Sequence, residues 1–406
     1  MTVAASARTP GWAGPLARTL APIGLVATVV GLVASFVSPF LPLFLSRDLH
    51  AGPGLVALFL FGMPLAAVGV STVIGRLSDR PGLRLRLLIL AAGTGCVGFL
   101  LFALVREYWL SLAVALTLIA VAASLAPQVF AFGRTLLDRA HPGRVATGIS
   151  WLRSLLSLSW VAGPPLAAYL IGAVDFRGLF LVAAAMYLAV LPVLLRYRGG
   201  RGGSAVPAGG SGAVTGPVLR TSAAFVLLQS AGSLGVMSMP LFVSVDLTGK
   251  VGDAGLILGL CAALEIPLML LFGALAGRWS LRRLVLVGAV IGIGYFAAMT
   301  LTRAVWQIAL AQLLNAAFIA AVTGLGISYF QDLMPDRPGR ATTTFTNTNR
   351  ISAMLAGLLV GVVQVTGYRF SYLIGAGLCA GGLALLVFAQ TSSRDPVRTA
   401  TTATVA

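Results

Sequence analysis

The chain has 406 residues, of which 58% are hydrophobic and 10% are charged, and its mean hydropathy is +0.97. A soluble domain carries about 25% charged residues, so this composition predicts a protein whose surface mostly faces a lipid bilayer. The formal net charge of +17 does not indicate a nucleic-acid partner, because the arginines stand singly or in small groups between apolar runs.

Twelve apolar segments follow one another along the chain, and each is long enough to cross a bilayer as a helix. The first is too long for the apolar part of a signal peptide and lacks a clear cleavage site, so we expect it to be retained. The fold predicted is an all-α polytopic membrane protein with twelve transmembrane helices. The segments run approximately over 20–45, 54–75, 87–105, 109–132, 145–171, 177–195, 221–245, 252–275, 284–302, 305–331, 343–366 and 370–390.

One long polar gap, 196–220, is rich in Gly, Ser and Arg and has the composition of a flexible linker. It predicts an N-terminal six-helix half (1–195) and a C-terminal six-helix half (221–406). If the N-terminus is cytoplasmic, twenty arginines fall on the inner side and six basic residues on the outer side. The positive-inside rule then places both termini and the linker in the cytoplasm.

The two halves share short charged turns. Residues 75–80 return as 273–278 at an offset of 198, and Arg84 then matches Arg282. Pro-Gly-Arg at 142–144 returns at 338–340, an offset of 196. Any polytopic protein has basic inner loops, but repeated turns at nearly one offset favour two parallel repeats, as in transporters.

The first charged turn has the pattern of a known motif. Its residues Gly75, Asp79, Arg80, Gly82 and Arg84 resemble the loop between helices two and three of the major facilitator superfamily. The resemblance implies that this loop braces neighbouring helices and gates the transporter, without touching substrate. A solvated basic loop is the alternative, and it explains the arginines but not the aspartate between two glycines. The second copy of the turn has Gly277 in place of that aspartate.

Narrower stretches resemble one family, the bacterial sugar efflux transporters of this superfamily. They are Leu-Glu-Ile-Pro at 264–267 and the stretches 313–319, 329–335, 341–350, 127–132 and 160–166. The similarity covers about 20–390. It implies a monomeric exporter in the bacterial inner membrane, with a small sugar such as lactose, glucose or a glycoside as substrate. It also implies exchange for protons, with no cofactor besides the coupled proton.

Glu265 is the one acidic residue near the middle of a predicted helix. An ionisable group inside the membrane is costly and is a functional candidate by default. A carboxyl group away from water holds its proton more readily, so Glu265 is a candidate to carry the coupled proton or to bind sugar hydroxyls. The alternative is a protonated structural residue that bonds to another helix.

Arg153 and Arg350 are the two cations inside predicted helices. A guanidinium offers five donors that suit sugar oxygens or a carboxylate such as Glu265. Asn347 and Asn349 stand beside Arg350 and predict a polar cluster there. The alternative is that both arginines lie near the cytoplasmic edge and extend to the lipid headgroups.

Other polar residues inside predicted helices are candidates for lining a wet cavity, and we favour Gln128 and Asn315. Interhelical packing explains any one of them equally well. Weaker candidates of the same kind are Gln229, Gln331, Trp151, Trp160 and Tyr329.

Gly163, Pro164 and Pro165 resemble the Gly-Pro-x-x-Gly element of helix five in superfamily exporters, with Ala167 in place of the last glycine. A helix bent and tightly packed here would limit leakage and favours export. Glycine and proline are common in membrane helices in any case.

Other functions remain as alternatives. An exporter of drugs or other amphiphiles would share this fold, and a membrane sensor is a different class for which we see no soluble output domain. We expect no enzyme, because the chain has no nucleophile motif, phosphate loop or metal-ligand spacing. Cys96, Cys261 and Cys379 each lie inside an apolar run without disulfide or metal spacing.

Overall fold

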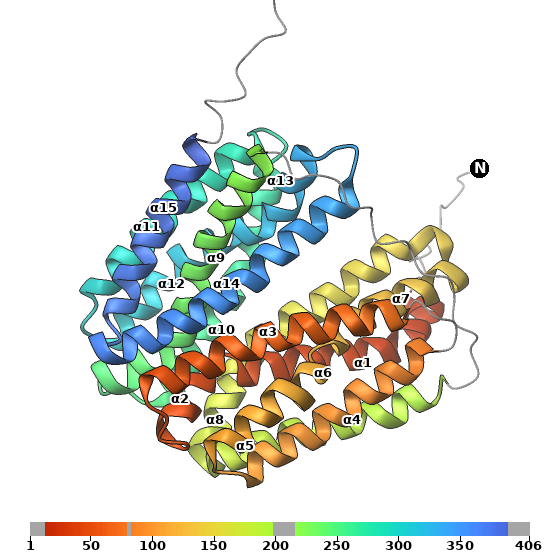
Figure 1. Ribbon diagram of the computed structural model, residues 1–406. Coiled ribbons are helices and arrows are strands. Elements are labelled where there is room, and N and C mark those ends of the chain that lie inside the picture. Colours follow the sequence, from red (N-terminus) through yellow and green to blue (C-terminus); the bar gives the residue numbers. More distant parts are fainter. Residues whose placement is uncertain (1–12, 79–82, 198–215, 389–406) are drawn as a thin grey trace, which may run out of the picture. The chain divides into compact units, whose positions relative to one another are not determined.

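The computed structural model describes residues 13–78, 83–197 and 216–388, and these ranges are almost wholly helical, without a strand (Figure 1). The first half contains α1 (Ala13–Val37), α2 (Leu41–Arg47), α3 (Pro53–Ser78), α4 (Leu83–Leu104), α5 (Tyr108–Val114), η1 (Ala115–Ile119), α6 (Ala120–Ala122), α7 (Leu125–Ala140), η2 (Pro142–Arg144) and α8 (Val145–Leu195). The second contains α9 (Gly216–Leu241), η3 (Phe242–Asp246), α10 (Val251–Leu275), α11 (Leu281–Leu301), α12 (Val305–Ile319), η4 (Ala320–Gly324), α13 (Leu325–Leu333), α14 (Pro338–Thr366) and α15 (Phe370–Phe388).

The prediction of twelve transmembrane helices is confirmed. Eleven stretches of the described chain are long and apolar enough to cross a membrane, and one of them, Thr147–Leu195, spans 49 residues. That stretch belongs to α8, whose backbone leaves helical geometry at Val174 and Asp175. Because α8 is thus two helices joined at a sharp bend, the eleven stretches make twelve crossings.

The chain forms two compact units. Unit 1 contains Met1–Ala51, Gly62–Val206 and Val251–Gly259, and unit 2 contains Gly52–Phe61, Pro207–Lys250 and Leu260–Ala406. The division predicted from the polar gap at 196–220 stays a prediction.

In unit 1, two serines join α1 to α8. Ser35 Oγ donates to the Ser159 carbonyl oxygen at 3.0 Å, and Ser159 Oγ donates to the Thr28 carbonyl oxygen at 3.2 Å. Small side chains and interhelical hydrogen bonds are how helices associate in lipid, where apolar burial gives little driving force.

Unit 2 joins α9 to α14 in the same way. Ser230 Oγ donates to the Ser352 carbonyl oxygen at 3.4 Å, and Ser352 Oγ donates to the Val226 carbonyl oxygen at 2.9 Å. The offsets from the unit 1 serines are 195 and 193, close to the offsets of the charged turns. The internal repeat therefore extends to a serine contact between two helices of each unit.

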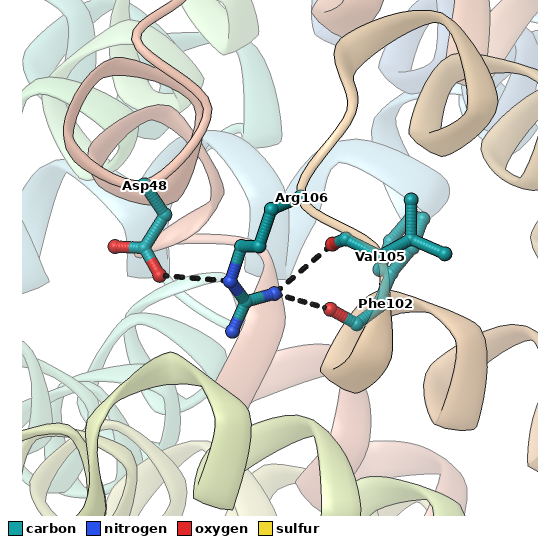
Figure 2. A network of polar contacts seen from close by, with 4 residues as sticks. All are labelled: Asp48, Phe102, Val105 and Arg106. Atoms are coloured by element: carbon teal, nitrogen blue, oxygen red, sulfur yellow. Dashed lines mark hydrogen bonds and ion pairs between the residues drawn. The ribbon is translucent and has the colours of Figure 1, made fainter.

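An arginine clasp joins two helix ends of unit 1 (Figure 2). Arg106 Nε lies 3.8 Å from Asp48 Oδ2, and Arg106 Nη1 donates to the carbonyl oxygens of Phe102 and Val105 at 2.8 and 3.1 Å. The guanidinium also lies over the Phe44 ring, 5.7 Å from its centre. One cation thus joins the end of α2 to the last turn of α4.

Asp48 titrates abnormally in this clasp. Burial raises the pKa of its carboxyl above the ordinary range, against the lowering effect of Arg106, and the negative charge of Asp175 raises the pKa further. Asp175 sits in the bend of α8 with a φ of 57°, a backbone conformation that non-glycine residues adopt rarely.

Unit 2 has a second clasp built on Arg369, which follows α14. Its backbone N–H donates to Asp246 Oδ2 at 2.9 Å, its Nη1 donates to the Thr300 carbonyl oxygen at 2.6 Å, and its guanidinium lies 5.5 Å from the centre of the Phe242 ring. The aspartate, the phenylalanine and the residue with the accepting carbonyl all follow their unit 1 counterparts by 198 positions. The arginine does not, because the residue 198 positions after Arg106 is Ala304.

Candidate functional site

Glu265 lies half-buried on α10, inside a membrane-spanning helix of unit 2. Cys261 stands one turn earlier on the same face, and its Sγ lies 3.7 Å from Glu265 Oε1. Residues four apart on a helix are neighbours on one face, so the sequence alone brings the thiol next to the carboxylate. The structure places this acidic residue where the sequence predicted it, inside a helix.

A series of hydrogen bonds continues from Cys261 to a second helix. Asn315 on α12 donates from Nδ2 to Cys261 Sγ at 3.3 Å and to Gln312 Oε1 at 3.0 Å. Gln312 in turn lies beside Tyr295 of α11 and donates to the Ile308 carbonyl oxygen at 3.2 Å. We call Glu265, Cys261, Asn315, Gln312 and Tyr295 the polar chain.

The polar chain is shielded from water except at its carboxylate end. Cys261 and Asn315 are 4% and 5% exposed, while Tyr295 and Gln312 are 1% and 0% exposed. Buried polar groups are retained when they bond to one another, and here hydrogen bonds link Glu265, Cys261, Asn315 and Gln312 in series. Glu265 is thus the point where a buried polar network meets a less buried surface.

Glycines on α11 allow α11 and α12 to approach closely next to the polar chain. A Cβ atom at Gly292 would lie 2.6 Å from the Phe318 ring, so a larger residue would push the helices apart. One turn after Asn315, α12 continues as the π-helical turn η4 (Ala320–Gly324). Such turns occur frequently at functional sites, where they redirect the helix that carries the site.

Part of the cluster predicted at the start of α14 turns away from the unit 2 interior. Asn347 and Asn349 are exposed and Arg350 is half-buried, while Thr348 between them is buried and donates to Gln229 Oε1 at 3.3 Å. The helical periodicity explains this, because alternate residues cannot share one face. These three residues stay candidates for substrate contact, and they are not part of the polar chain.

The unit 1 candidates lie on different helices. Arg153 is exposed on α8, and Gln128 is 7% exposed on α7. The Oε1 atom of Gln128 is buried and has no hydrogen-bond partner among the described residues. Trp151 packs against Gly24 of α1, where a Cβ atom would lie 2.6 Å from its ring.

Most of the gating loop lies outside the described residues, namely Asp79, Arg80 and Gly82. Gly75 lies in α3, and Arg84, in the first turn of α4, donates from Nη1 to Thr135 Oγ1 on α7 at 2.9 Å. Its repeat partner Arg282 opens α11 and donates from Nη2 to the Leu386 carbonyl oxygen of α15 at 2.9 Å. In each unit the arginine therefore ties the start of its helix to another helix.

The Gly163-Pro164-Pro165 element lies at a crowded contact of unit 1. A Cβ atom at Gly163 would overlap Ser35 Oγ, and one at Gly255 would lie 2.6 Å from the Pro164 carbonyl oxygen. The glycines let three helix segments of this unit approach closely. The tight packing expected from the sequence is thus present, while a role in export stays a prediction.

Sequence reasoning missed Cys261, Gln312 and Tyr295. The spacing of Cys261 and Glu265 and of Gln312 and Asn315 was a usable signal, since residues three or four apart share a helix face. Nothing in the sequence indicated which faces of α10, α11 and α12 meet.

Comparison with known proteins identifies the family. The model of the Major Facilitator Superfamily matches residues 23–302 and 221–405. The chain belongs to this superfamily. Its members are transporters and not enzymes, as the sequence predicted.

Relatives that are about one third identical in sequence support the assignment to the bacterial sugar efflux transporters. A putative sugar efflux transporter of Deinococcus radiodurans is 34% identical over 375 residues, which cover 90% of this chain and 96% of that protein. Sugar efflux transporter A of Dickeya chrysanthemi is 33% identical, covering 88% and 92%, and sugar efflux transporter C of Escherichia coli is 33% identical, covering 91% and 95%. The predicted resemblance to bacterial sugar efflux transporters is confirmed.

Solved structures of the superfamily show the same fold. The crystal structure of a mutant of the nucleoside transporter NupG has a TM-score of 0.75 at 13% identity, covering 92% of this chain and all of that one. A POT family transporter has a TM-score of 0.76 at 14% identity, covering 92% and 96%. At these identities the likeness shows the fold alone.

Proposed function

We propose that this protein exports small sugars across the cytoplasmic membrane of a bacterium in exchange for protons. The relatives named sugar efflux transporters match nearly the whole chain at about one third identity, which supports the sugar as substrate. Both termini lie in the cytoplasm, as the distribution of arginines favours. The protein acts as a monomer and needs no cofactor beyond the coupled proton.

The observation that carries the coupling mechanism is the placement of Glu265 at the exposed end of the polar chain. A carboxylate in a membrane helix loses its negative charge when it takes up a proton. Its protonation therefore changes how favourably the side chain packs among the surrounding helices. A proton from outside neutralises Glu265, the protonated and sugar-free transporter turns to face the cytoplasm, and Glu265 releases the proton there. The sugar site opens to one side at a time, as alternating access requires.

The substrate contacts that we propose come from exposed or half-buried polar groups. Arg153, Arg350, Asn347 and Asn349 offer donors, and the Asn side chains also offer acceptors. Sugar hydroxyls pair with both kinds of group. The polar chain itself is too buried for direct contact except at Glu265.

The decisive experiment measures efflux of radiolabelled lactose and glucose from proteoliposomes, with and without an imposed pH gradient. Glu265→Gln keeps the shape of the side chain and removes its charge, so we expect loss of gradient-driven efflux by at least about tenfold. The chain's other glutamate supplies the matched control, since Glu107 caps α5 through the N–H groups of Trp109 and Leu110. Glu107→Gln should retain gradient-driven efflux.

Two outcomes would overturn the proposal. Gradient-driven efflux at the wild-type rate in Glu265→Gln would remove the proton role from this residue. Export of a lipophilic dye without export of any sugar in the panel would instead support a drug exporter.

A further inference from the structure

The atoms of the polar chain determine which group donates and which accepts in its hydrogen bonds. The Nδ2 atom of Asn315 carries two hydrogens and no acceptor site, so it donates both of its bonds, one to Gln312 Oε1 and one to Cys261 Sγ. The sulfur of Cys261 is therefore an acceptor toward α12. Its own hydrogen is left to point along α10 to Glu265 Oε1, 3.7 Å away.

A thiol hydrogen aimed at a carboxylate distinguishes the two protonation states of that carboxylate. The ionised form accepts such a bond strongly, and the neutral form accepts it less well. Hydrogen bonding to the charged form favours that form. Cys261 therefore opposes the effect of burial, which favours the neutral form.

The buried partners keep this donor in place. Asn315 is held by Gln312, and Gln312 is held by the Ile308 carbonyl oxygen, so the amide that orients the thiol has little freedom. An unoriented thiol would divide its time among the backbone carbonyl oxygens of its own helix. The interhelical part of the polar chain thus acts on Glu265 through Cys261.

We propose that Cys261 and Asn315 are positioning residues that stabilise the ionised form of the Glu265 carboxylate, which is the form that accepts the proton. They thereby set the pH range over which proton uptake drives sugar efflux. This inference rests on the proposed function, because it assigns to the polar chain a role in the proton step. It places no residue other than Glu265 in contact with the transported proton.

The test is the pH dependence of gradient-driven lactose efflux in proteoliposomes of the full-length protein. Cys261→Ala removes the donor to the ionised carboxylate, so the pH of half-maximal efflux should rise by about half a unit to one unit. Cys261→Ser restores a donor at the same position and should return the profile toward that of the wild type. Asn315→Leu leaves the thiol unoriented and should shift the profile in the same direction by less.

Cys379→Ala is the matched control. Cys379 is also a fully buried thiol of unit 2, on α15, and it packs against Gly292 outside the polar chain. A structural effect of removing a buried sulfur should appear in both alanine variants as a lower melting temperature. A shift of the pH profile should appear only in Cys261→Ala.

The outcomes separate this inference from the function on which it rests. A wild-type pH profile in both Cys261→Ala and Asn315→Leu, with coupling lost in Glu265→Gln, would overturn the positioning role and leave the proposed function standing. Retained coupling in Glu265→Gln would overturn both. If Cys261→Ala does not assemble, the comparison of Cys261→Ser with Asn315→Leu decides, since only the second should shift the profile.

Discussion

The two arginine clasps join the same three repeated positions with arginines from different places in the chain, but Arg106 reaches Asp48 with its guanidinium and Arg369 reaches Asp246 with its backbone N–H. In unit 1 the cation comes from Arg106, just after α4, and in unit 2 it comes from Arg369, between α14 and α15. Each arginine contacts an aspartate, a phenylalanine ring and a backbone carbonyl oxygen, and these partners stand at repeated positions. The difference teaches that the fold needs a cation at this place, because a half-buried carboxylate and an unpaired helix-end carbonyl are costly without one.

The residues inside the helices differ between the two halves more than the clasp contacts at the helix ends do. At an offset of 198, Glu265, Cys261 and Tyr295 of the polar chain correspond to Ala67, Met63 and Val97 of the first half. The serine contacts and the helix-start arginines are repeated, while the first half has Ala67 at the position that corresponds to Glu265. The scaffold is thus shared, and the proposed proton chemistry belongs to one unit.

The largest effect on stability should come from the serine contacts between helices. The residue four positions after the second serine is glycine in unit 1 and alanine in unit 2, a difference of one methyl group. Gly163 stands four residues after Ser159, and Ala356 stands four residues after Ser352. A Cβ atom at Gly163 would overlap Ser35 Oγ, so Gly163→Ala should destabilise the protein by about 1–3 kcal/mol. The melting temperature of the purified protein in detergent measures this.

Gly172→Ala is the control in the same helix, because nothing lies within 4 Å of a Cβ atom there. It should leave the melting temperature near that of the wild type. Equal melting temperatures for the Gly163 and Gly172 variants would mean that α1 and α8 are not as close as the structure shows.

The two arginine clasps predict a second, smaller effect on the free energy of unfolding. Arg106→Ala removes every contact of its clasp to Asp48, whereas Arg369→Ala keeps the backbone N–H bond to Asp246. We expect Arg106→Ala to cost about 1–2 kcal/mol and Arg369→Ala about half as much, because each lost hydrogen bond contributes about 0.5–1.5 kcal/mol. Thermal unfolding of both variants under one set of conditions checks the order, and the reverse order would contradict it.

The smallest effect concerns pH. The pKa of Asp48 in the folded protein lies above its unfolded value, so the folded state binds the proton more tightly. The stability gained from that proton is complete below about pH 3.9 and is lost as the pH rises through the folded-state value. The melting temperature of Asp48→Asn, relative to the wild type, should therefore rise slightly between about pH 4 and pH 7.

Asp138→Asn is the control for removing a carboxylate from an ion pair, since Asp138 forms an exposed pair with Arg134. A flat difference for Asp48→Asn would show that burial does not perturb this carboxyl.

The sequence by itself determined the number of transmembrane helices, the family and the place of Glu265 near the middle of one of these helices. These follow from local properties, because a run of about 20 apolar residues has few alternatives in a bilayer and a charge within it stands out. Parts of the repeat were also readable, since Arg84 and Arg282 share an offset with the charged turns. The bend of α8 at Asp175 divides two segments that the sequence had already separated at 171–177.

Only the tertiary structure decided which polar residues meet. Cys261, Gln312 and Tyr295 look like ordinary core residues in the sequence, and they join Glu265 and Asn315 because α10, α11 and α12 turn particular faces toward one another. The same holds for Arg369, which no offset connects to Arg106. Helix rotation and close approach depend on packing between distant segments, such as Phe318 against Gly292, and that packing has no signature within a single helix.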